Sequence, residues 1–268
     1  MMEAKKKKLL KTLPSLQNVD IDSVFSFNED TLTSHIPIQH LKPAIKKILG
    51  EIEITQDILR YQTNKPHNPQ IKNIIAIASG KGGVGKSTVA FYLAQALKHC
   101  GAKVGLLDAD IYGPSQTLMF NLNEKPQVNE QKMFIPFHSF GIDVMSIGSL
   151  VSDDKALMWR GPMISQALVQ LYEKTAWHDL DYLLIDLPPG TGDIPITLIQ
   201  KIPVTTSLLV TIPHALSNFD VKKCQGLFEH LGLPILGTVS NQTLFTCSHC
   251  HSKQPLYSEA VDSIFNCH

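Results

Sequence analysis

The sequence carries no net charge and contains no long apolar run. Its 268 residues include 24 Lys and Arg against 24 Asp and Glu, a balance that gives no electrostatic reason to expect a polyanionic partner. No apolar stretch approaches the length of about 20 residues that a membrane-spanning helix needs. We therefore expect neither a nucleic acid nor a membrane as a partner.

Cysteine is scarce, and a recognisable export signal is missing. The five cysteines are an odd number without the paired spacing of a disulfide scaffold, which favours a reducing, cytoplasmic location. Residues 5–8 are all lysine, like the start of a signal peptide, but the following segment, with Lys11 and Pro14, offers no apolar core. We interpret the basic run as a solvated tail.

The sequence does contain a glycine-rich loop between a predicted strand and a predicted helix. Residues 74–78 are apolar and predict a buried strand, and a helical pattern begins near Lys86. Glycines let the backbone curl with its N–H groups inward, and the helix adds its positive end, so the loop can bind an anion. Lys86 would reach the β- and γ-phosphates of a nucleotide, and the Ser87 hydroxyl suits Mg²⁺. The loop residues are Gly80, Lys81, Gly82, Gly83, Val84, Gly85, Lys86, Ser87 and Thr88.

Acidic residues follow two further predicted strands. Residues 182–185 are apolar and end at Asp186, the pattern of a Walker B carboxylate that directs Mg²⁺ or its water. Residues 104–107 precede Asp108 and Asp110, which would share one face in extended backbone. We expect Asp108 to support the Mg²⁺ shell and Asp110 to orient the attacking water. The alternative for each acid is a turn cap.

Strands and helices alternate along most of the chain. Further strands are predicted over residues 207–212 and 235–240, and residues 134–137 and 142–147 would add a hairpin or extra strands. A further helix is predicted over residues 163–172. This alternation predicts an α/β fold, a P-loop NTPase with a mostly parallel sheet and flanking helices.

Another helix is predicted after Ser217, which with Asp220 resembles a capping box. In a parallel sheet of this kind, ligands bind at the carboxyl ends of the strands, where the acidic residues stand.

The N-terminal quarter has a different pattern. Residues 24–27 and 31–36 alternate around a polar turn and predict a hairpin, and residues 41–52 have the apolar spacing of a helix. We therefore expect three parts along the chain. They are a small α+β domain over 1–66, a proline-containing linker over 67–72 and an ATPase domain over 73–268.

Lys81 is a second lysine within the phosphate loop. Two ammonium groups in one loop would crowd positive charge unless one of them points elsewhere. Lys81 could therefore reach outward to the nucleotide of a second subunit, as a positively charged finger.

The phosphate loop resembles the deviant loop of the MinD/ParA class of dimerising ATPases. Residues 108–115, 159–163 and 186–193 resemble one branch of that class, the Mrp/ApbC family of iron–sulfur cluster carrier ATPases. The resemblance implies a homodimer that binds ATP and Mg²⁺, hydrolyses ATP, holds a labile [4Fe–4S] cluster at its interface and delivers it to apoproteins. It also implies that Asn241 reads the base, with a polar turn residue as the alternative, and that the N-terminal domain is a degenerate MIP18-like domain.

Cys247 and Cys250 form a C-x-x-C where the family has one. A [4Fe–4S] cluster takes four thiolates, so two chains would each supply two. Cys100 and Cys224 fall in predicted helices and are expected to be buried, and Cys267 lies near the end of the sequence. Family members continue well past this motif, so the domain is either truncated or divergent by this comparison, and the sequence leaves the completeness of the adenine pocket open.

Two alternatives stay open at this stage. One is a MinD/ParA-like positioning ATPase without a cluster, which would want a basic surface or an amphipathic C-terminal helix; residues 258–268 contain no lysine or arginine. The other is a structural zinc site that adds histidine ligands to the two cysteines. The candidate histidines are His249, His251 and His268.

Overall fold

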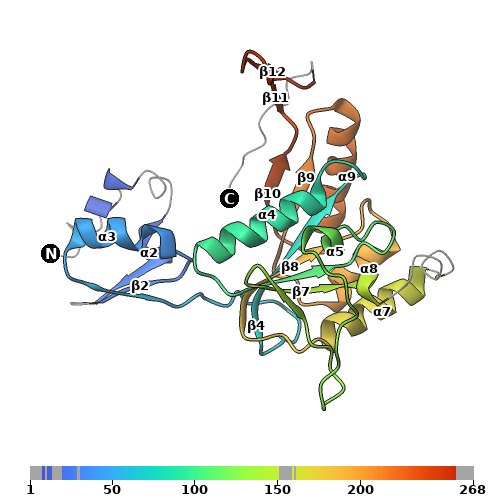
Figure 1. The fold of residues 1–268 in the computed structure, drawn as a ribbon, viewed down its shortest axis with the longest axis horizontal. Coiled ribbons are helices and arrows are strands. Elements are labelled where there is room, and N and C mark those ends of the chain that lie inside the picture. Colours follow the sequence, from blue (N-terminus) through green and yellow to red (C-terminus); the bar gives the residue numbers. More distant parts are fainter. Residues whose placement is uncertain are drawn as a thin grey trace.

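A seven-stranded sheet forms the centre of the larger part of the molecule (Figure 1). The structure is a computed structural model and describes residues 8–9, 11–13, 20–28, 31–150, 159 and 161–257. The strands of this sheet are β4 (Ile71–Ser79), β5 (Val104–Asp108), β6 (Phe137–Ser139), β7 (Ile142–Ser146), β8 (Leu180–Asp186), β9 (Thr206–Thr211) and β10 (Ile235–Ser240). Their order is β10-β9-β4-β8-β5-β7-β6, and every neighbouring pair is parallel except β6 and β7. The predicted mostly parallel α/β fold is confirmed.

Helices cover both faces of this sheet. They are α4 (Lys86–His99), α5 (Gln116–Met119), α7 (Gly161–Glu173), α8 (Asp193–Lys201) and α9 (Ala215–His230). The central strand β4 sends Ile74 and Ala76 into a core that it shares with α7, α8 and α9. It sends Ile75 and Ile77 into a second core with α4. Burial on both faces explains why the strands are apolar runs rather than alternating patterns.

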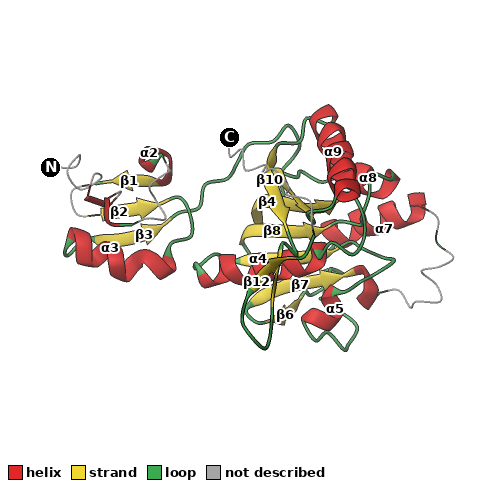
Figure 2. Cartoon of the chain, turned by 90° about the horizontal axis from the view of Figure 1, so that it is seen from above, coloured by secondary structure: helices red, strands yellow, loops and turns green. Residues whose placement is uncertain are grey.

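The N-terminal unit, residues 20–56, forms a separate small sheet beside the large one (Figure 2). Its elements are α2 (Ile21–Val24), β1 (Phe25–Phe27), β2 (Thr31–Ser34), a short 3₁₀ helix (Gln39–Leu41), α3 (Lys42–Leu49) and β3 (Glu53–Gln56). The predicted β1–β2 hairpin is confirmed. The predicted helix over 41–52 is too long, because Gly50 (φ 82°) ends α3 and residues 53–56 pair with β2 as an unpredicted parallel strand.

Residues 57–70 connect the two sheets. The last two residues of the expected 67–72 linker lie in β4, which begins at Ile71. The connection is fastened to that strand, since Asn73 accepts a hydrogen bond from the Tyr61 N–H (3.0 Å) and donates to the Leu59 carbonyl (2.9 Å). No helix within the described residues is long and apolar enough to cross a membrane.

One local prediction was wrong and another was shifted along the chain. The expected capping box does not start α9, because His214 is the N-cap and its Nδ1 accepts from the Leu216 N–H (3.3 Å), while Ser217 lies inside the helix. The hairpin expected from residues 134–137 and 142–147 does form, but its first strand, β6, starts at Phe137.

We expect the N-terminal unit to unfold separately from the larger part. Ile45 is fully buried in its core, so Ile45→Ala should lower the unfolding free energy of the unit by about 2–5 kcal/mol. Scanning calorimetry should show one transition moved to lower temperature and one unmoved. Leu106→Ala, in the core under α4, should move the other transition. A single transition that both variants shift equally would contradict a separate unit.

Candidate functional site

The phosphate loop joins the end of β4 to the start of α4. Gly83 and Gly85 adopt positive φ angles of 81° and 84°, the left-handed region that glycine tolerates best. A Cβ on Gly83 would meet nothing within 4 Å, whereas one on Gly85 would lie 2.3 Å from the Asn241 amide nitrogen. The loop is therefore open on one side and closely backed on the other, as expected of a cradle for an anion.

Lys86 lies at the centre of a buried cluster of carboxylates. Its ammonium donates a hydrogen bond to Asp186 Oδ1 at 2.5 Å and lies 3.9 Å from Asp110 Oδ2. Asp108 ends the neighbouring strand β5 and is paired in register with Asp186 of β8. The structure thus brings together the lysine and all three acids that the sequence singled out.

The extended geometry expected for Asp108 and Asp110 is wrong. β5 ends at Asp108, and the Asp110 N–H turns back to donate to Asp108 Oδ1 at 3.2 Å. A further turn follows, in which the Gly113 N–H bonds to the Asp110 carbonyl. This turn, rather than a shared strand face, places both carboxylates near Lys86.

Two polar residues of the cluster were missed by the sequence analysis. The Gln116 side-chain amide donates to Asp186 Oδ2 and to the Ser87 carbonyl, both at 2.9 Å. The Ser146 hydroxyl donates to Asp108 Oδ2 at 3.0 Å. A signal for each was present: Gln116 directly follows the 108–115 stretch, and Ser146 ends an apolar strand at the carboxyl edge of the sheet.

The cluster carries an excess of negative charge in a buried setting. Burial and, to a smaller extent, the neighbouring Asp186 charge raise the pKa of Asp108 to about 7, and burial raises the pKa of Asp110. Among the described residues, Asp110 Oδ1 and Gln116 Oε1 are buried acceptors without a hydrogen-bond partner. Carboxylate oxygens around one lysine suit a divalent cation such as Mg²⁺, so the residues present fit a magnesium–nucleotide complex.

The remaining residues predicted for this site lie on the loop or beside it. The Lys81 side chain is half-buried and forms no ion pair with any residue that the structure describes. The Asn241 amide donates to the Val84 carbonyl at 3.0 Å, and its backbone N–H bonds to the Thr211 carbonyl. Asn241 therefore supports the loop from behind. Whether it also reads a base stays a prediction.

The C-x-x-C occupies the turn of an exposed hairpin that projects from the end of β10 (Figure 1). The hairpin consists of β11 (Leu244–Thr246) and β12 (Lys253–Pro255), which pair antiparallel. The Cys247 N–H bonds to the Ser252 carbonyl (3.0 Å) and the His251 N–H to the Cys247 carbonyl (2.9 Å), which closes the turn. Cys247 is half-buried and Cys250 is exposed. Both thiols are thus held in one short loop near solvent.

The electrostatic setting of the cysteines differs along the chain. Hydrogen bonds from Ser252 and from Cys247 lower the pKa of the exposed Cys250 thiol to about 7. Burial raises the pKa of Cys224, inside α9, to about 11. Cys100 is only half-buried at the end of α4, so the expectation of a buried residue was wrong there. Cys267 lies outside the described residues.

The zinc alternative gains no support from the hairpin. Within the described ranges, no group of three or more His, Cys, Asp or Glu side chains is placed to hold a metal ion. His249 and His251 therefore do not join the two cysteines, and His268 is outside the described residues. In the part of the chain that the structure describes, the hairpin thus offers a pair of thiols rather than a complete metal site.

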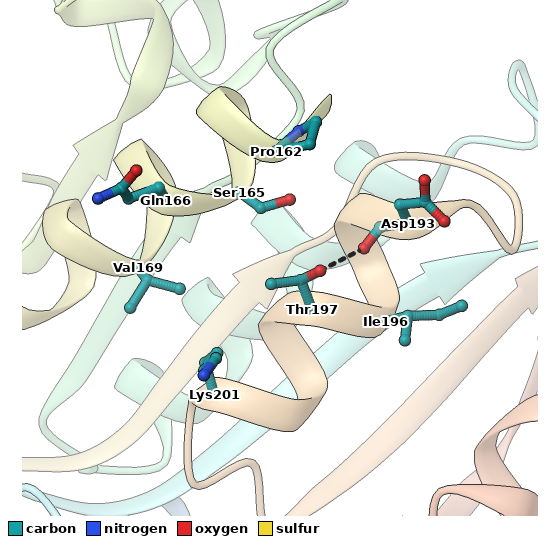
Figure 3. A pocket seen from close by; sticks show the side chains of 8 residues that line it. All are labelled: Pro162, Ser165, Gln166, Val169, Asp193, Ile196, Thr197 and Lys201. Carbon is teal, nitrogen blue, oxygen red and sulfur yellow. Dashed lines mark hydrogen bonds between the residues drawn. The ribbon is translucent and has the colours of Figure 1, made fainter. Parts of the chain in front are cut away.

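A groove runs between α7 and α8, next to the loop that follows Asp186 (Figure 3). Its volume is about 580 Å³, and its lining residues are Pro162, Ser165, Gln166, Val169, Asp193, Ile196, Thr197 and Lys201. The Thr197 hydroxyl within it donates to the Asp193 carbonyl at 2.7 Å. None of the lining residues belongs to the phosphate loop or to the carboxylate cluster, so the groove is separate from the nucleotide site.

Comparison with known proteins agrees with this geometry. A family model described as the ParA-type NUBPL iron-transfer P-loop NTPase matches residues 70–265. An iron–sulfur cluster carrier protein of Pseudomonas fragi is 50% identical over 200 residues, which are 74% of this chain and 70% of that protein. Its Escherichia coli K12 counterpart is 49% identical over 200 residues, but the match spans only 54% of that protein.

Solved structures show the same fold. A nucleotide-binding protein of Archaeoglobus fulgidus, solved with ADP, matches with a TM-score of 0.62 and 39% identity over 71% of this chain and 74% of that one. The septum site-determining protein MinD of Pyrococcus horikoshii, solved with Mg-ADP, has a TM-score of 0.51 and 22% identity over 63% of this chain and 70% of its own. At that identity the second match supports the fold alone.

The parallel sheet, the phosphate loop and the carboxylate cluster define a P-loop NTPase of the MinD/ParA type, a class of ATP hydrolases. Within that class, the chain belongs to the family of NUBPL iron-transfer P-loop NTPases. The family resemblance drawn from the sequence motifs is confirmed.

We expect Lys86→Ala to weaken ATP binding at least tenfold. The change removes a charge-assisted contact to phosphate of about 1.5–3 kcal/mol. Isothermal titration calorimetry with Mg-ATP should measure it, with circular dichroism to verify folding. Lys125→Ala, at an exposed lysine outside the loop, is the control. Wild-type affinity in Lys86→Ala would remove the lysine from the nucleotide site.

Proposed function

We propose that this chain is an ATP-hydrolysing iron–sulfur cluster carrier that binds its cargo through the C-x-x-C hairpins of two copies. The observation that carries the proposal is the pairing of a buried nucleotide site with two solvent-accessible thiols on one hairpin. Relatives named as cluster carrier and cluster transfer proteins support the same cargo. Apo iron–sulfur proteins are the recipients, and the carrier works in a reducing, cytoplasmic setting.

The nucleotide site assigns a role to each residue of the cluster. The loop amides and Lys86 bind the phosphates, and Mg²⁺ is held by Ser87, Asp108 and Asp186. Bound Mg²⁺ supplies charge neutralisation for the phosphates. Asp110 orients the attacking water, and the Lys86 ammonium, paired with Asp186 in this structure, is positioned to bind a phosphate oxygen instead.

The cargo site follows from the count of thiols. A [4Fe–4S] cluster takes four thiolates, and one hairpin offers Cys247 and Cys250. A two-fold dimer brings the same surface of both copies together, which supplies the other two. Phe245 and Leu256 on the hairpin are about half exposed, at 53% and 47%, and would be covered by such a contact. A cluster shared between chains near solvent is labile, as transfer to an apoprotein requires.

The dimer also gives Lys81 its role. The half-buried Lys81 side chain has no ion-pair partner within the described part of its own chain, so its ammonium is available to act on the nucleotide of the second copy.

Lys81→Ala should therefore slow ATP hydrolysis, since finger-type groups contribute about 10³–10⁵ in rate, while ATP affinity changes much less. Steady-state phosphate release, measured beside binding, tests this. Mixing Lys81→Ala with catalytically dead Lys86→Ala subunits supplies the finger from the Lys86→Ala copy and should restore part of the rate. Normal hydrolysis in Lys81→Ala, or no recovery on mixing, would contradict a role in trans.

Cys247→Ser and Cys250→Ser should each abolish cluster binding and leave ATP binding intact, because each removes two of the four thiolates in a symmetric dimer. Iron and acid-labile sulfide analysis after anaerobic reconstitution measures the effect. Cys100→Ser, at a half-buried thiol outside the hairpin, is the matched control and should keep the cluster. Full iron retention in Cys247→Ser, or tight zinc in place of iron in the wild type, would contradict the assignment.

A further inference from the structure

Lys65, in the connection between the two sheets, caps a helix of the larger part. Its ammonium donates hydrogen bonds to the carbonyl oxygens of Ile199 and Ile202, the latter at 3.1 Å. Both carbonyls belong to the C-terminal end of α8, where backbone acceptors lack helical partners and the helix dipole is negative. A residue 134 positions away along the chain thus supplies the C-terminal cap of α8.

The position of Lys65 is built by its neighbours. The Thr63 hydroxyl donates to the Lys65 carbonyl at 3.2 Å, and the Thr63 N–H donates to His67 Nε2 at 3.3 Å, so a tight turn presents the lysine. The side chain is half-buried, and this burial lowers the pKa of Lys65. Lys201 lies on the same helix end but is exposed and makes no hydrogen bond or ion pair with the described residues. Of these two lysines, therefore, only Lys65 is engaged.

The other end of α8 begins at the loop that follows Asp186. In the structure this loop is fastened to β4, because the Gly190 N–H donates to the Ser79 carbonyl at 2.8 Å and the Leu187 N–H to the Ile77 carbonyl at 3.0 Å. Loops at this position in P-loop proteins are held or released by the γ-phosphate. α8 therefore connects a nucleotide-responsive loop to Lys65 over nine residues.

The N-terminal unit itself is attached to a different helix. The Gln39 N–H donates to the Cys100 carbonyl at 2.8 Å, and the Gln56 side chain donates to the Gly101 carbonyl at 3.1 Å, both at the C-terminal end of α4. Figure 1 shows this end of α4 directed at the unit. A Cβ on Gly101 would lie 2.7 Å from that of Gln39, so the contact is close. Because α4 starts at the phosphate loop, the unit has a fixed attachment there, and Lys65 adds a second contact at α8.

We propose that the Lys65 cap regulates the nucleotide site. The cap stabilises the position of α8 that accompanies the hydrogen bond between Gly190, in the preceding loop, and Ser79, and ATP binding releases the cap. The γ-phosphate competes for the loop, whereas ADP leaves the loop and the cap in place. By linkage, a cap that opposes ATP must itself be weakened by ATP to the same degree. The connection to the N-terminal unit thereby senses which nucleotide is bound. This inference rests on the proposed ATPase function.

The test compares Lys65→Met with Lys201→Met in the full chain. A single cation at a helix end contributes little, so Lys65→Met should raise affinity for a fluorescent non-hydrolysable ATP analogue about two- to fivefold and leave ADP affinity unchanged. Lys201→Met removes a charge from the same helix end without removing the cap and should change neither affinity. Lys65→Arg, which keeps the charge and donors, should stay close to wild type.

Hydrogen exchange of residues 62–70 and of the last turn of α8 provides the second readout. In the wild type the ATP analogue should accelerate exchange there and ADP should not, and Lys65→Met should exchange fast with either. An unchanged ratio of ATP to ADP affinity in Lys65→Met, or an equal change in Lys201→Met, would overturn the proposal. Failure of the unmodified protein to bind either nucleotide would overturn the ATPase function itself. Neither measurement depends on whether the protein carries an iron–sulfur cluster.

Discussion

The buried ammonium of Lys86 among three carboxylates is the interaction on which the rest of the nucleotide site depends. Asp108 and Asp186 end adjacent parallel strands, and the turn after Asp108 adds Asp110, so the negative charge of all three is gathered at one edge of the sheet. Such a cluster would be costly to bury without a cation, because like charges in a poorly solvated setting repel strongly. The lysine offsets part of that cost, and Mg²⁺ with its phosphates completes the balance.

The two sites of the molecule make opposite demands on their surroundings. The nucleotide site is buried, with Asp186 and Asp108 inaccessible to solvent, which strengthens its electrostatic interactions. The hairpin carries its thiols at the surface, where Cys250 is exposed and its neighbours are accessible. A cluster carrier needs one buried and one exposed site, since the nucleotide must be bound in a fixed geometry while the cluster must be accessible for transfer. The α8 helix, which Lys65 caps, lies between the loop after Asp186 and the connection that leads to the N-terminal unit.

Much of the fold was predictable because local patterns agree with the tertiary structure. The apolar runs that became β4, β5 and β8 could bury both faces only in a parallel sheet, and the glycine loop required a strand before it and a helix after it. The strand β3 was missed because Ile52 continues the helical spacing and β3 itself contains one apolar residue, Ile54. Pairing with β2, which is distant in sequence, makes residues 53–56 a strand.

The site was predictable at strand ends and not beyond them. Asp108 and Asp186 follow from strand geometry, whereas the places of Gln116 and Ser146 in the sequence were only weak signals, and tertiary hydrogen bonds decide that both side chains join the cluster. The same holds for Lys65, whose partners are carbonyl groups distant in sequence. Ser217 looked like a helix cap, but α9 already begins at Ala215, so His214 is the N-cap and its side chain accepts from the Leu216 N–H.

The central claim is that two copies share one cluster through their C-x-x-C hairpins. Native mass spectrometry of the anaerobically reconstituted protein tests it most directly, because it weighs monomer and dimer separately with their bound metal. The account predicts a dimer that carries one cluster of four irons and four sulfides, because four thiolates require two hairpins, and a monomer that carries no cluster. A monomer that retains a complete cluster, or a dimer that contains only zinc, would contradict it.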